Sequence, residues 1–390
     1  MINVAKKKTM RFVLMIAIVL FAVAGVLGAF FAPERAQAAE VTYTYSDIKP
    51  VSKYDYSLLA IPDIQNITKW RTDNLNAMFT QLAMTAKRDK IKFAMQLGDL
   101  CQDPTEAQFT AARYAFSLLD GVLPYAVVPG NHDYDRYTGG TPTDKSDTMI
   151  NKYFTYDFYS KQSIFGGAMT TGNIINTYYL LDQSGAKYLF IALEDAPSSA
   201  ALDWMDGVIK KYPDRRVIIF THDYLNVDTN FSRSPAGQDI WTVAKKYANI
   251  FMIICGHRSN PIPAIKAVKG DNGNTVQEIL FDLQNVFDEG GHNVPIVLIM
   301  KFNEPEKTVN FCMYNPVKNL CMNDFQYSQS FADPLNPAVG EVAIVEPPKT
   351  DDDNDGDEKT DDGGCKSQNA AALLLLLAAA ALFAVPKRAA

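Results

Sequence analysis

Three of the four histidines in this 390-residue chain lie in short polar motifs whose side chains are typical metal donors. The motifs, in chain order, are Asp63-Ile64-Gln65, Gly98-Asp99-Leu100, Gly130-Asn131-His132-Asp133, Thr221-His222-Asp223 and Gly256-His257. Carboxylate, amide and imidazole groups are the oxygen and nitrogen ligands that divalent ions accept in proteins. Two such ions, bridged by one carboxylate, can activate water and neutralise charge on a reacting ester. The residue types and their order therefore indicate a binuclear metal site.

Each motif directly follows a short apolar segment that we expect to form a β-strand. The segments are residues 57–61, 91–97, 125–128, 217–220 and 251–254. Between them, residues 73–89 and 105–119 repeat apolar residues at helical spacing, which predicts strands that alternate with amphipathic helices. Open α/β sheets build ligand sites at the carboxyl ends of their strands. Five polar motifs at five strand ends are therefore expected to converge.

Two other regions differ from this alternation. Residues 134–176 are rich in Tyr, Thr, Gly and Asn, and we expect a long loop near the site that carries substrate contacts. Residues 177–193 and 275–314 have the pattern of successive strands, and we expect hairpins that complete a second sheet.

The two ends of the chain resemble export and attachment signals. Residues 1–38 combine a basic start, an apolar run and Ala36-Gln37-Ala38, which predicts a cleaved signal peptide, with an uncleaved anchor as the alternative. Residues 336–364 are typical of an acidic disordered linker. Residues 365–390 place an apolar stretch before Lys387-Arg388, similar to a bacterial C-terminal sorting signal, with a membrane tail anchor as the alternative. Either end predicts an exported protein attached to the cell surface or membrane.

Charge and cysteine content narrow the remaining possibilities. The formal net charge of −7 argues against nucleic acid as a partner, because phosphate backbones bind basic surfaces. Cys101 and Cys255 adjoin predicted strands, where a buried apolar role is expected. Cys312 and Cys321 could pair across a hairpin, which the sequence leaves open, as it does the oligomeric state.

In order and in position after strands, the motifs resemble those of calcineurin-like metallophosphoesterases, over about residues 55 to 315. The resemblance implies that residues 39–335 form the catalytic domain, an α/β fold built as a four-layer αββα sandwich of two mixed β-sheets. It also implies two divalent metal ions, either manganese or iron and zinc. Attack of a metal-bound hydroxide on phosphorus would then hydrolyse a phosphate ester.

The resemblance also assigns roles to residues of this chain. Asp99 would bridge both ions, with Asp63 and Gln65 on the first ion. The second ion would be bound by Asn131, His222 and His257. His132 would not bind metal, but would stabilise or protonate the leaving-group oxygen.

Three positions depart from the family pattern. Gln65 replaces the His of the usual Asp-x-His motif, and Ser259 stands where the second His of Gly-His-x-His is expected. The first ion is then left with oxygen donors, with Ser259 or solvent as a further one, which predicts a weak, manganese-like first site. The acid that often orients the catalytic His would fall at Gln102, beside Asp103, and that role stays unassigned.

Further residues near the motifs have two possible roles each. Arg258 either clamps a phosphate oxygen or forms a surface ion pair, and His292 either approaches the substrate or lies in a surface loop. Asp133 and Asp223 are expected to accept backbone hydrogen bonds that orient loops.

The sequence thus predicts a secreted or surface-attached metal-dependent phosphoesterase, acting on mono- or diesters of a phosphorylated small molecule or envelope component. One alternative is a surface binding protein with a degenerate metal site, which Ser259 favours and the retention of His132 opposes. Another is a nucleotide or lipid-headgroup diphosphatase.

Overall fold

The computed structural model describes residues 45–46, 53–134, 137–138, 141–142, 145, 148–285 and 293–335. The signal peptide predicted at 1–38, the linker at 336–364, the segment 365–390 and His292 lie outside the described residues. Among the helices that are described, none has the length and apolar character needed to cross a membrane.

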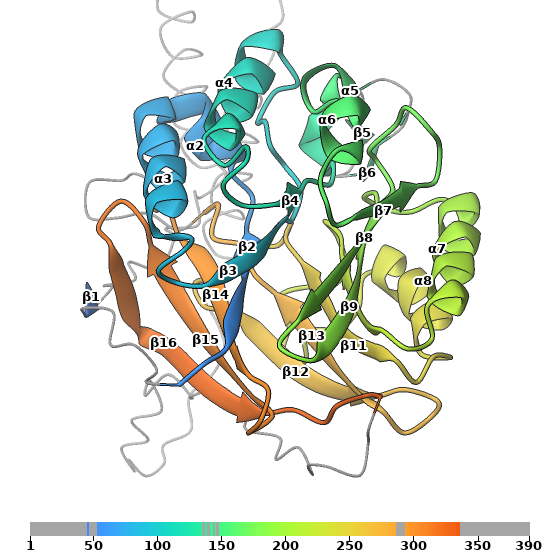
Figure 1. Ribbon diagram of the computed structural model, residues 1–390. Coiled ribbons are helices and arrows are strands. Elements are labelled where there is room, and N and C mark those ends of the chain that lie inside the picture. The colour runs from blue at the N-terminus through green and yellow to red at the C-terminus, as the bar shows by residue number, and fades with distance from the viewer. Residues whose placement is uncertain are drawn as a thin grey trace, which may run out of the picture. The chain divides into compact units, whose positions relative to one another are not determined.

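Two seven-stranded sheets form the described domain (Figure 1). The first has the strand order β1-β16-β15-β14-β2-β3-β4 and the second the order β12-β13-β11-β10-β9-β8-β7. The strands of the first sheet are β1 (Tyr45–Ser46), β2 (Tyr56–Ile61), β3 (Ile91–Gln96), β4 (Tyr125–Ala126), β14 (Val297–Asn303), β15 (Thr308–Asn315) and β16 (Leu320–Ser330). Those of the second are β7 (Phe165–Ala168), β8 (Thr177–Gln183), β9 (Ala186–Ala192), β10 (Arg216–Phe220), β11 (Ile250–Cys255), β12 (Ala264–Lys269) and β13 (Thr275–Leu280). A small separate hairpin joins β5 (Tyr137–Thr138) and β6 (Thr141–Pro142).

Both sheets are mixed. In the first, β2 pairs parallel with β3 and β3 with β4, while β14 is antiparallel to β2. In the second, β9, β10, β11 and β13 run parallel, with β8 and β12 antiparallel at their sides.

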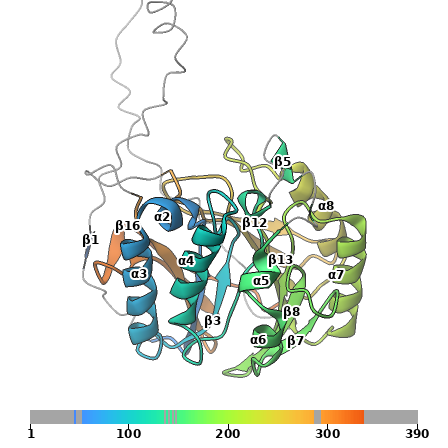
Figure 2. The same cartoon turned by 90° about the horizontal axis from the view of Figure 1, so that it is seen from above.

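Helices cover the outer face of each sheet (Figures 1 and 2). Beside the first sheet lie α2 (Gln65–Trp70), α3 (Thr72–Thr85) and α4 (Glu106–Ser117), and beside the second lie α7 (Ser199–Lys211) and α8 (Pro235–Ala244). The short helix η1 (Asn131–Asp133) lies in the Gly-Asn-His-Asp motif, whereas α5 (Ile150–Tyr153) and α6 (Tyr156–Ser160) fall within residues 134–176, the segment predicted as a long loop. The order of layers is helix, sheet, sheet, helix, which confirms the predicted αββα sandwich.

Aromatic side chains join the inner faces of the two sheets. The ring of Phe93 on β3 lies 4.6 Å from that of Phe190 on β9 and 5.2 Å from that of Tyr179 on β8. Leu189 and Ile191 point from β9 to the opposite face, into a separate core beneath α7 and α8. This alternation is the period of two expected of a strand buried on both faces.

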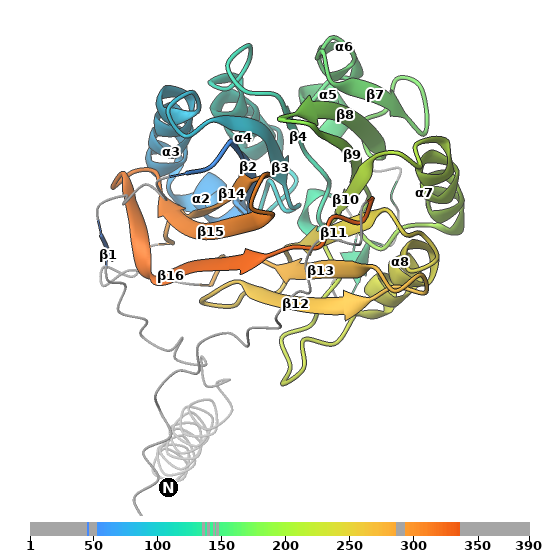
Figure 3. The ribbon, with the colours of Figure 1, turned by 60° about the horizontal axis from the view of Figure 1, so that its bottom comes forward.

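One part of the predicted topology is wrong. We expected all the strands within residues 275–314 to complete the second sheet, but only β13 lies there. β14 and β15 belong to the first sheet, since Leu298 of β14 pairs with Ala60 of β2. Figure 3 shows β16 running beside β13, where Gln329 donates a hydrogen bond to Gln277 at 3.0 Å.

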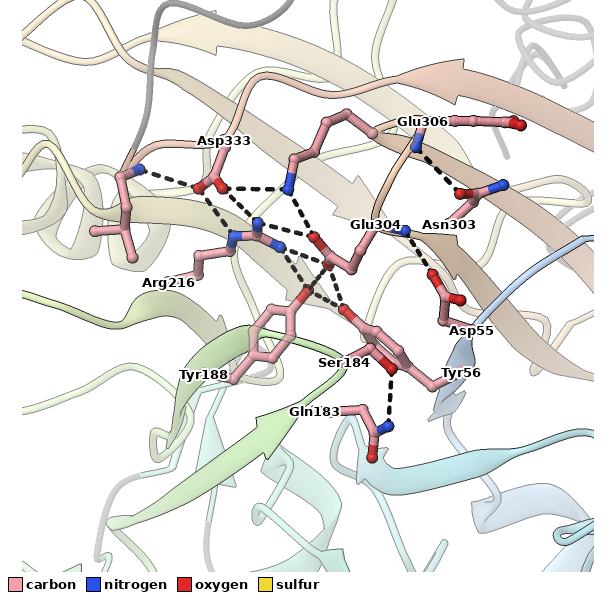
Figure 4. Close-up of polar contacts among 12 residues, drawn as sticks. Asp55, Tyr56, Gln183, Ser184, Tyr188, Arg216, Asn303, Glu304, Glu306 and Asp333 are labelled. Carbon is pink, nitrogen blue, oxygen red and sulfur yellow. Dashed lines mark hydrogen bonds and ion pairs between the residues drawn. The ribbon is translucent and has the colours of Figure 1, made fainter.

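A buried ion cluster ties the sheets together at the edge where β10 begins (Figure 4). Arg216 donates to both carboxylate oxygens of Glu304, at 2.6 and 2.9 Å, and to Asp333 at 3.0 Å. The hydroxyl of Tyr56 also donates to Glu304, at 2.6 Å. Because Thr221 and His222 follow the other end of β10, this cluster lies at the edge opposite the polar motifs.

Of the four cysteines in the described residues, two form a disulfide and two are free thiols. Cys312 and Cys321 form a disulfide that links β15 to β16, which settles the pairing left open by the sequence. Cys101 and Cys255 are free thiols with no exposed surface, as expected for small apolar side chains.

Candidate metal centre

The five polar motifs meet where the carboxyl ends of both sheets come together. Asp63, Asp99 and Asn131 follow β2, β3 and β4 of the first sheet, whereas His222 and His257 follow β10 and β11 of the second. The parallel registers place Ile61 beside Gln96 and Phe220 beside Ile254, so motifs on neighbouring strands end level with one another. The predicted convergence is therefore present, but it spans two sheets, not one.

A compact donor group forms around His222. Its Nε2 lies 3.0 Å from Asn131 Oδ1, 3.0 Å from His257 Nδ1 and 3.4 Å from Asp99 Oδ1. Ligand atoms of Asp99, His222 and His257 all lie within 4.8 Å of one another. The other ring nitrogen of His222, Nδ1, donates to the carbonyl of Leu97 at 2.9 Å. This bond directs the lone pair of Nε2 toward the group, as in metal-binding histidines.

The charges of this group fit a divalent cation. Asp99 Oδ2 is buried and has no hydrogen-bond partner among the described residues. Burial opposes protonation of His222, but the carboxylates of Asp99 and Asp63 outweigh it and raise the His222 pKa well above its usual range. Burial and the neighbouring charge of His222 lower the pKa of His257 to about 3. Carboxylates that favour a positive charge at this point, one of them with an unpartnered oxygen, form an environment that a bound divalent cation would stabilise.

The backbone is strained at two of these donors. Asp99 and His257 have φ values of 53° and 69°, in the left-handed region that few residues other than glycine adopt. Gly98 precedes Asp99 with φ of 97°, and a Cβ there would come within 2.6 Å of Cγ of His222. Strained positions of this kind are concentrated at functional sites.

The predicted ligands of the first ion lie beside this group. Asp63 is 5% exposed, and its two carboxylate oxygens accept hydrogen bonds from the backbone N–H of His257 at 3.2 Å. Gln65 donates its amide N–H to Oε1 of Gln284, while its own Oε1 is buried without a partner in the described part of the chain. The hydroxyl of Ser259 accepts a hydrogen bond from the N–H of Asn285 at 3.0 Å. The assignment of these groups to a first ion stays a prediction.

His132 is held at the edge of the donor group. Its backbone N–H donates to Asp99 Oδ1 at 2.9 Å, and its Nδ1 lies 2.9 Å from the carbonyl oxygen of Gln102. A backbone carbonyl, which can accept the Nδ1 proton, thus stands where the sequence left the orienting group unassigned. Asp103 instead pairs with Lys69 at 2.6 Å.

The remaining predicted residues differ in outcome. Asp133 accepts three backbone hydrogen bonds, from Gly130, Leu100 and Cys101 at 2.9 to 3.1 Å, which confirms its loop-orienting role. The same expectation fails at Oδ1 of Asp223, which is buried and has no partner within the described ranges. Arg258 is exposed, and its charge acts on Asp223 and His257. A substrate contact by Arg258 stays a prediction.

Two acidic residues at the site were missed by sequence reasoning. Asp195 follows β9 and is 1% exposed, and burial raises its pKa to about 7. Asp282 follows β13 and has no exposed surface, and burial raises its pKa to about 7 as well. A signal for Asp282 is present in the sequence, because Asp282-Leu283-Gln284-Asn285 repeats the pattern of Asp63-Ile64-Gln65-Asn66 after another strand.

Comparison with known proteins gives one matching family and several similar chains. A family model described as calcineurin-like phosphoesterase matches residues 56–260, a shorter span than the 55–315 expected. The protein YvnB of Bacillus subtilis (strain 168) is 28% identical over 285 residues, covering 71% of this chain and 20% of that protein. A probable cyclic nucleotide phosphodiesterase of Moraxella catarrhalis (strain BBH18) is 25% identical over 211 residues, covering 48% and 66% of the two chains. The purple acid phosphatase PPD1 from yellow lupin seeds superposes with a TM-score of 0.48 at 13% identity, covering 72% of this chain and 55% of that one.

Two mixed sheets with nitrogen and oxygen donors at their joint edge define a metallophosphoesterase-type domain. The chain belongs to the calcineurin-like phosphoesterase family, a family that uses a dinuclear divalent metal centre. This confirms the resemblance to the calcineurin-like metallophosphoesterases. The chain spans a fifth of the length of YvnB and about two thirds of that of the Moraxella protein.

Proposed function

We propose that this protein is an exported or surface-attached metal-dependent phosphoesterase that hydrolyses phosphate esters. The observation that carries the proposal is the convergence of Asp99, Asn131, His222 and His257, with His132 hydrogen-bonded to the same Asp99 oxygen that faces His222. A binding protein would need the metal donors, but it would have no need for a histidine held in this position.

The residues of the site divide the chemistry between them. When bound, two divalent ions would activate water and neutralise phosphate oxygens. Asp99, Asn131, His222 and His257 would hold one of those ions. The His132 ring is held by the bond from its Nδ1 to the Gln102 carbonyl. When both ring nitrogens carry a proton, Nε2 would give its proton to the leaving-group oxygen and leave the ring neutral.

The name of one relative narrows the substrate class. The relative named as a probable cyclic nucleotide phosphodiesterase favours diesters over monoesters as the first class to assay.

Two features support export. The first is the sequence at the amino end, where basic residues and an apolar run precede Ala36-Gln37-Ala38. The Cys312–Cys321 disulfide supports it too, because disulfides persist mainly in oxidising compartments.

The test is hydrolysis of chromogenic phosphodiester and phosphomonoester substrates by the purified protein with added Mn²⁺. We expect His132→Ala to lower kcat by roughly 10²- to 10⁴-fold, the contribution of a positioned proton donor, while retained metal stays the same. Asp103→Asn is the matched control, since Asp103 neighbours His132 in the fold but pairs with Lys69. Equal background rates for the unaltered protein and His132→Ala would reject the enzymatic proposal in favour of binding.

A further inference from the structure

The second Asp-x-Gln segment, residues 282–284, lies at the edge of the metal centre. β13 runs parallel to β11 with Cys255 beside Leu280, so this register puts Asp282 level with His257 two residues further on. The family model ends at residue 260, so this segment lies outside the part of the chain that it matches.

Asp282 is a buried carboxylate with an unused oxygen. Its Oδ1 accepts a hydrogen bond from the N–H of Gln284 at 2.8 Å. Its Oδ2 is buried and has no hydrogen-bond partner among the residues that the structure describes. Asp133, by contrast, is also fully buried but accepts three backbone hydrogen bonds. Burying a carboxylate without such partners is costly unless a cation binds it.

The charged groups that act on Asp282 are residues of the candidate metal centre. The carboxylates of Asp282 and Asp63 lie close enough to act on each other. His222 and Asp99 act on Asp282 in turn. The buried carboxylates of Asp63, Asp99 and Asp282 thus lie near the buried imidazole of His222, and a divalent cation would balance their negative charge.

Gln284 connects this segment to the first Asp-x-Gln motif. Its Oε1 accepts the amide N–H of Gln65, and its Nε2 donates to the carbonyl of His257 at 3.1 Å. With its N–H engaged in this way, Gln65 keeps a buried, unpartnered Oε1 within the described structure. The paired amides thus leave the oxygen end of Gln65 available to a ligand.

The loop that lacks the expected histidine is fixed beside Asp282. The N–H of Asn260 donates to the carbonyl of Asp282 at 2.9 Å, and the Ser259 hydroxyl accepts from Asn285. Ser259 is therefore engaged within the protein, whereas Oδ2 of Asp282 has no hydrogen-bond partner in the described part of the chain.

We propose that Asp282 is a ligand of the first metal ion, in place of the histidine absent at position 259, and that Gln284 orients Gln65 as a further oxygen ligand. The inference rests on the proposed metal-dependent activity. The first ion would then have oxygen donors only, from Asp63, Gln65, Asp99 and Asp282, a set that suits Mn²⁺ or Mg²⁺ better than Zn²⁺.

The experiment measures metal binding and thermal unfolding of the full chain, without any substrate. Asp282→Asn keeps the shape and the Oδ1 acceptor but removes the charge. We expect the unaltered protein to bind two equivalents of Mn²⁺ and the variant to bind one, or to bind the second at least about tenfold more weakly. In EDTA the variant should melt at a higher temperature, because an unpaired buried charge is gone, and Mn²⁺ should raise its Tm less.

Asp195→Asn is the matched control, because Asp195 is equally buried at a strand end and also acts on His222. Its Oδ1 also has no partner among the described residues, but Asp195 lies outside the proposed set of first-ion ligands. We expect it to keep both equivalents. Loss of the same ion in Asp195→Asn would overturn the proposal by showing that general charge, not ligation, holds the metal. Two equivalents of unchanged affinity in Asp282→Asn would overturn it directly.

A second variant covers the case in which Asp282→Asn does not fold. Gln284→Ala keeps Asp282 and removes the partner of Gln65, and it should weaken the same ion by about tenfold. Unchanged Mn²⁺ binding by Gln284→Ala would reject the role of Gln284. Failure of the unaltered protein to hydrolyse phosphate esters while it retains two ions would reject the proposed function, and leave this inference intact.

Discussion

Replacing Gly256 by Ala tests whether Asp63 must occupy its observed position to bind metal. A Cβ added at Gly256 would lie closer than 3.0 Å to Oδ1 of Asp63 and 2.9 Å from the carbonyl oxygen of Leu97. Real Cβ atoms essentially never come within 3.0 Å of such neighbours. The backbone at Gly256 does not have a positive φ, so alanine adds this overlap without a conformational penalty of its own.

The size of the effect follows from these distances. Ordinary contact with a Cβ begins near 3.4 Å, so the Asp63 carboxylate must move by more than roughly 0.4 Å. Metal–ligand distances are held to within about 0.2 Å, so a shift of this size removes Asp63 as a good ligand. We expect Mn²⁺ affinity at the first site, where Asp63 would bind, to fall by at least about tenfold.

Isothermal titration of the metal-free protein with Mn²⁺ measures both sites in one experiment. Gly207→Ala is the control, because Gly207 lies in α7 with nothing within 4 Å of its added Cβ. That change should leave both affinities unaltered and stabilise the helix by about 0.5–1 kcal/mol. Two binding events of unchanged affinity in Gly256→Ala would refute the assignment of Asp63 to the first ion.

Two further predictions concern stability. Burial raises the pKa of Glu304, but hydrogen bonds from Arg216 and Tyr56 outweigh burial and hold the pKa below the usual 4.5. The contribution of Glu304 to stability is therefore complete above about pH 4.5 and is lost as the pH falls through the pKa of the folded state. In EDTA, Glu304→Gln should therefore cost about 3 kcal/mol at pH 7 and flatten the loss of stability in acid, measured by urea unfolding; an unaltered acid profile would contradict this. Replacing Cys312 and Cys321 by Ser opens a bridge across nine residues and should lower the free energy of unfolding by about 2–3 kcal/mol, and reductant should then have no further effect.

The parts of the site that could be predicted are those set by local position on a strand. Asp99, His222 and His257 each follow an apolar strand directly, so the sequence pattern placed them at a common edge without knowledge of pairing. The sheet to which β14 belongs could not be predicted in this way. Its hairpin with β15 is a local feature, whereas its pairing with β2 depends on contacts more than two hundred residues apart in the sequence.

Two other features of the site could be assigned only once the fold was known. The group that orients His132 is the main-chain carbonyl of Gln102, and any residue type supplies a carbonyl. Asp282 depends on the register between β11 and β13, which brings it level with His257 although the two are 25 residues apart. The repeated Asp-x-Gln-Asn pattern was visible in the sequence, but its meaning required the fold.

The ion cluster around Arg216 determines where a force on the carboxyl end of the described fold would act. Asp333 is anchored there, two residues before the described fold ends at Leu335, and the cluster lies at the base of β10, away from His222. A force applied to the chain after Leu335, through a fusion partner or a surface linkage, would therefore act on the domain at the start of β10. The load would fall on Arg216 and Glu304 before it reached His222 at the other end of β10.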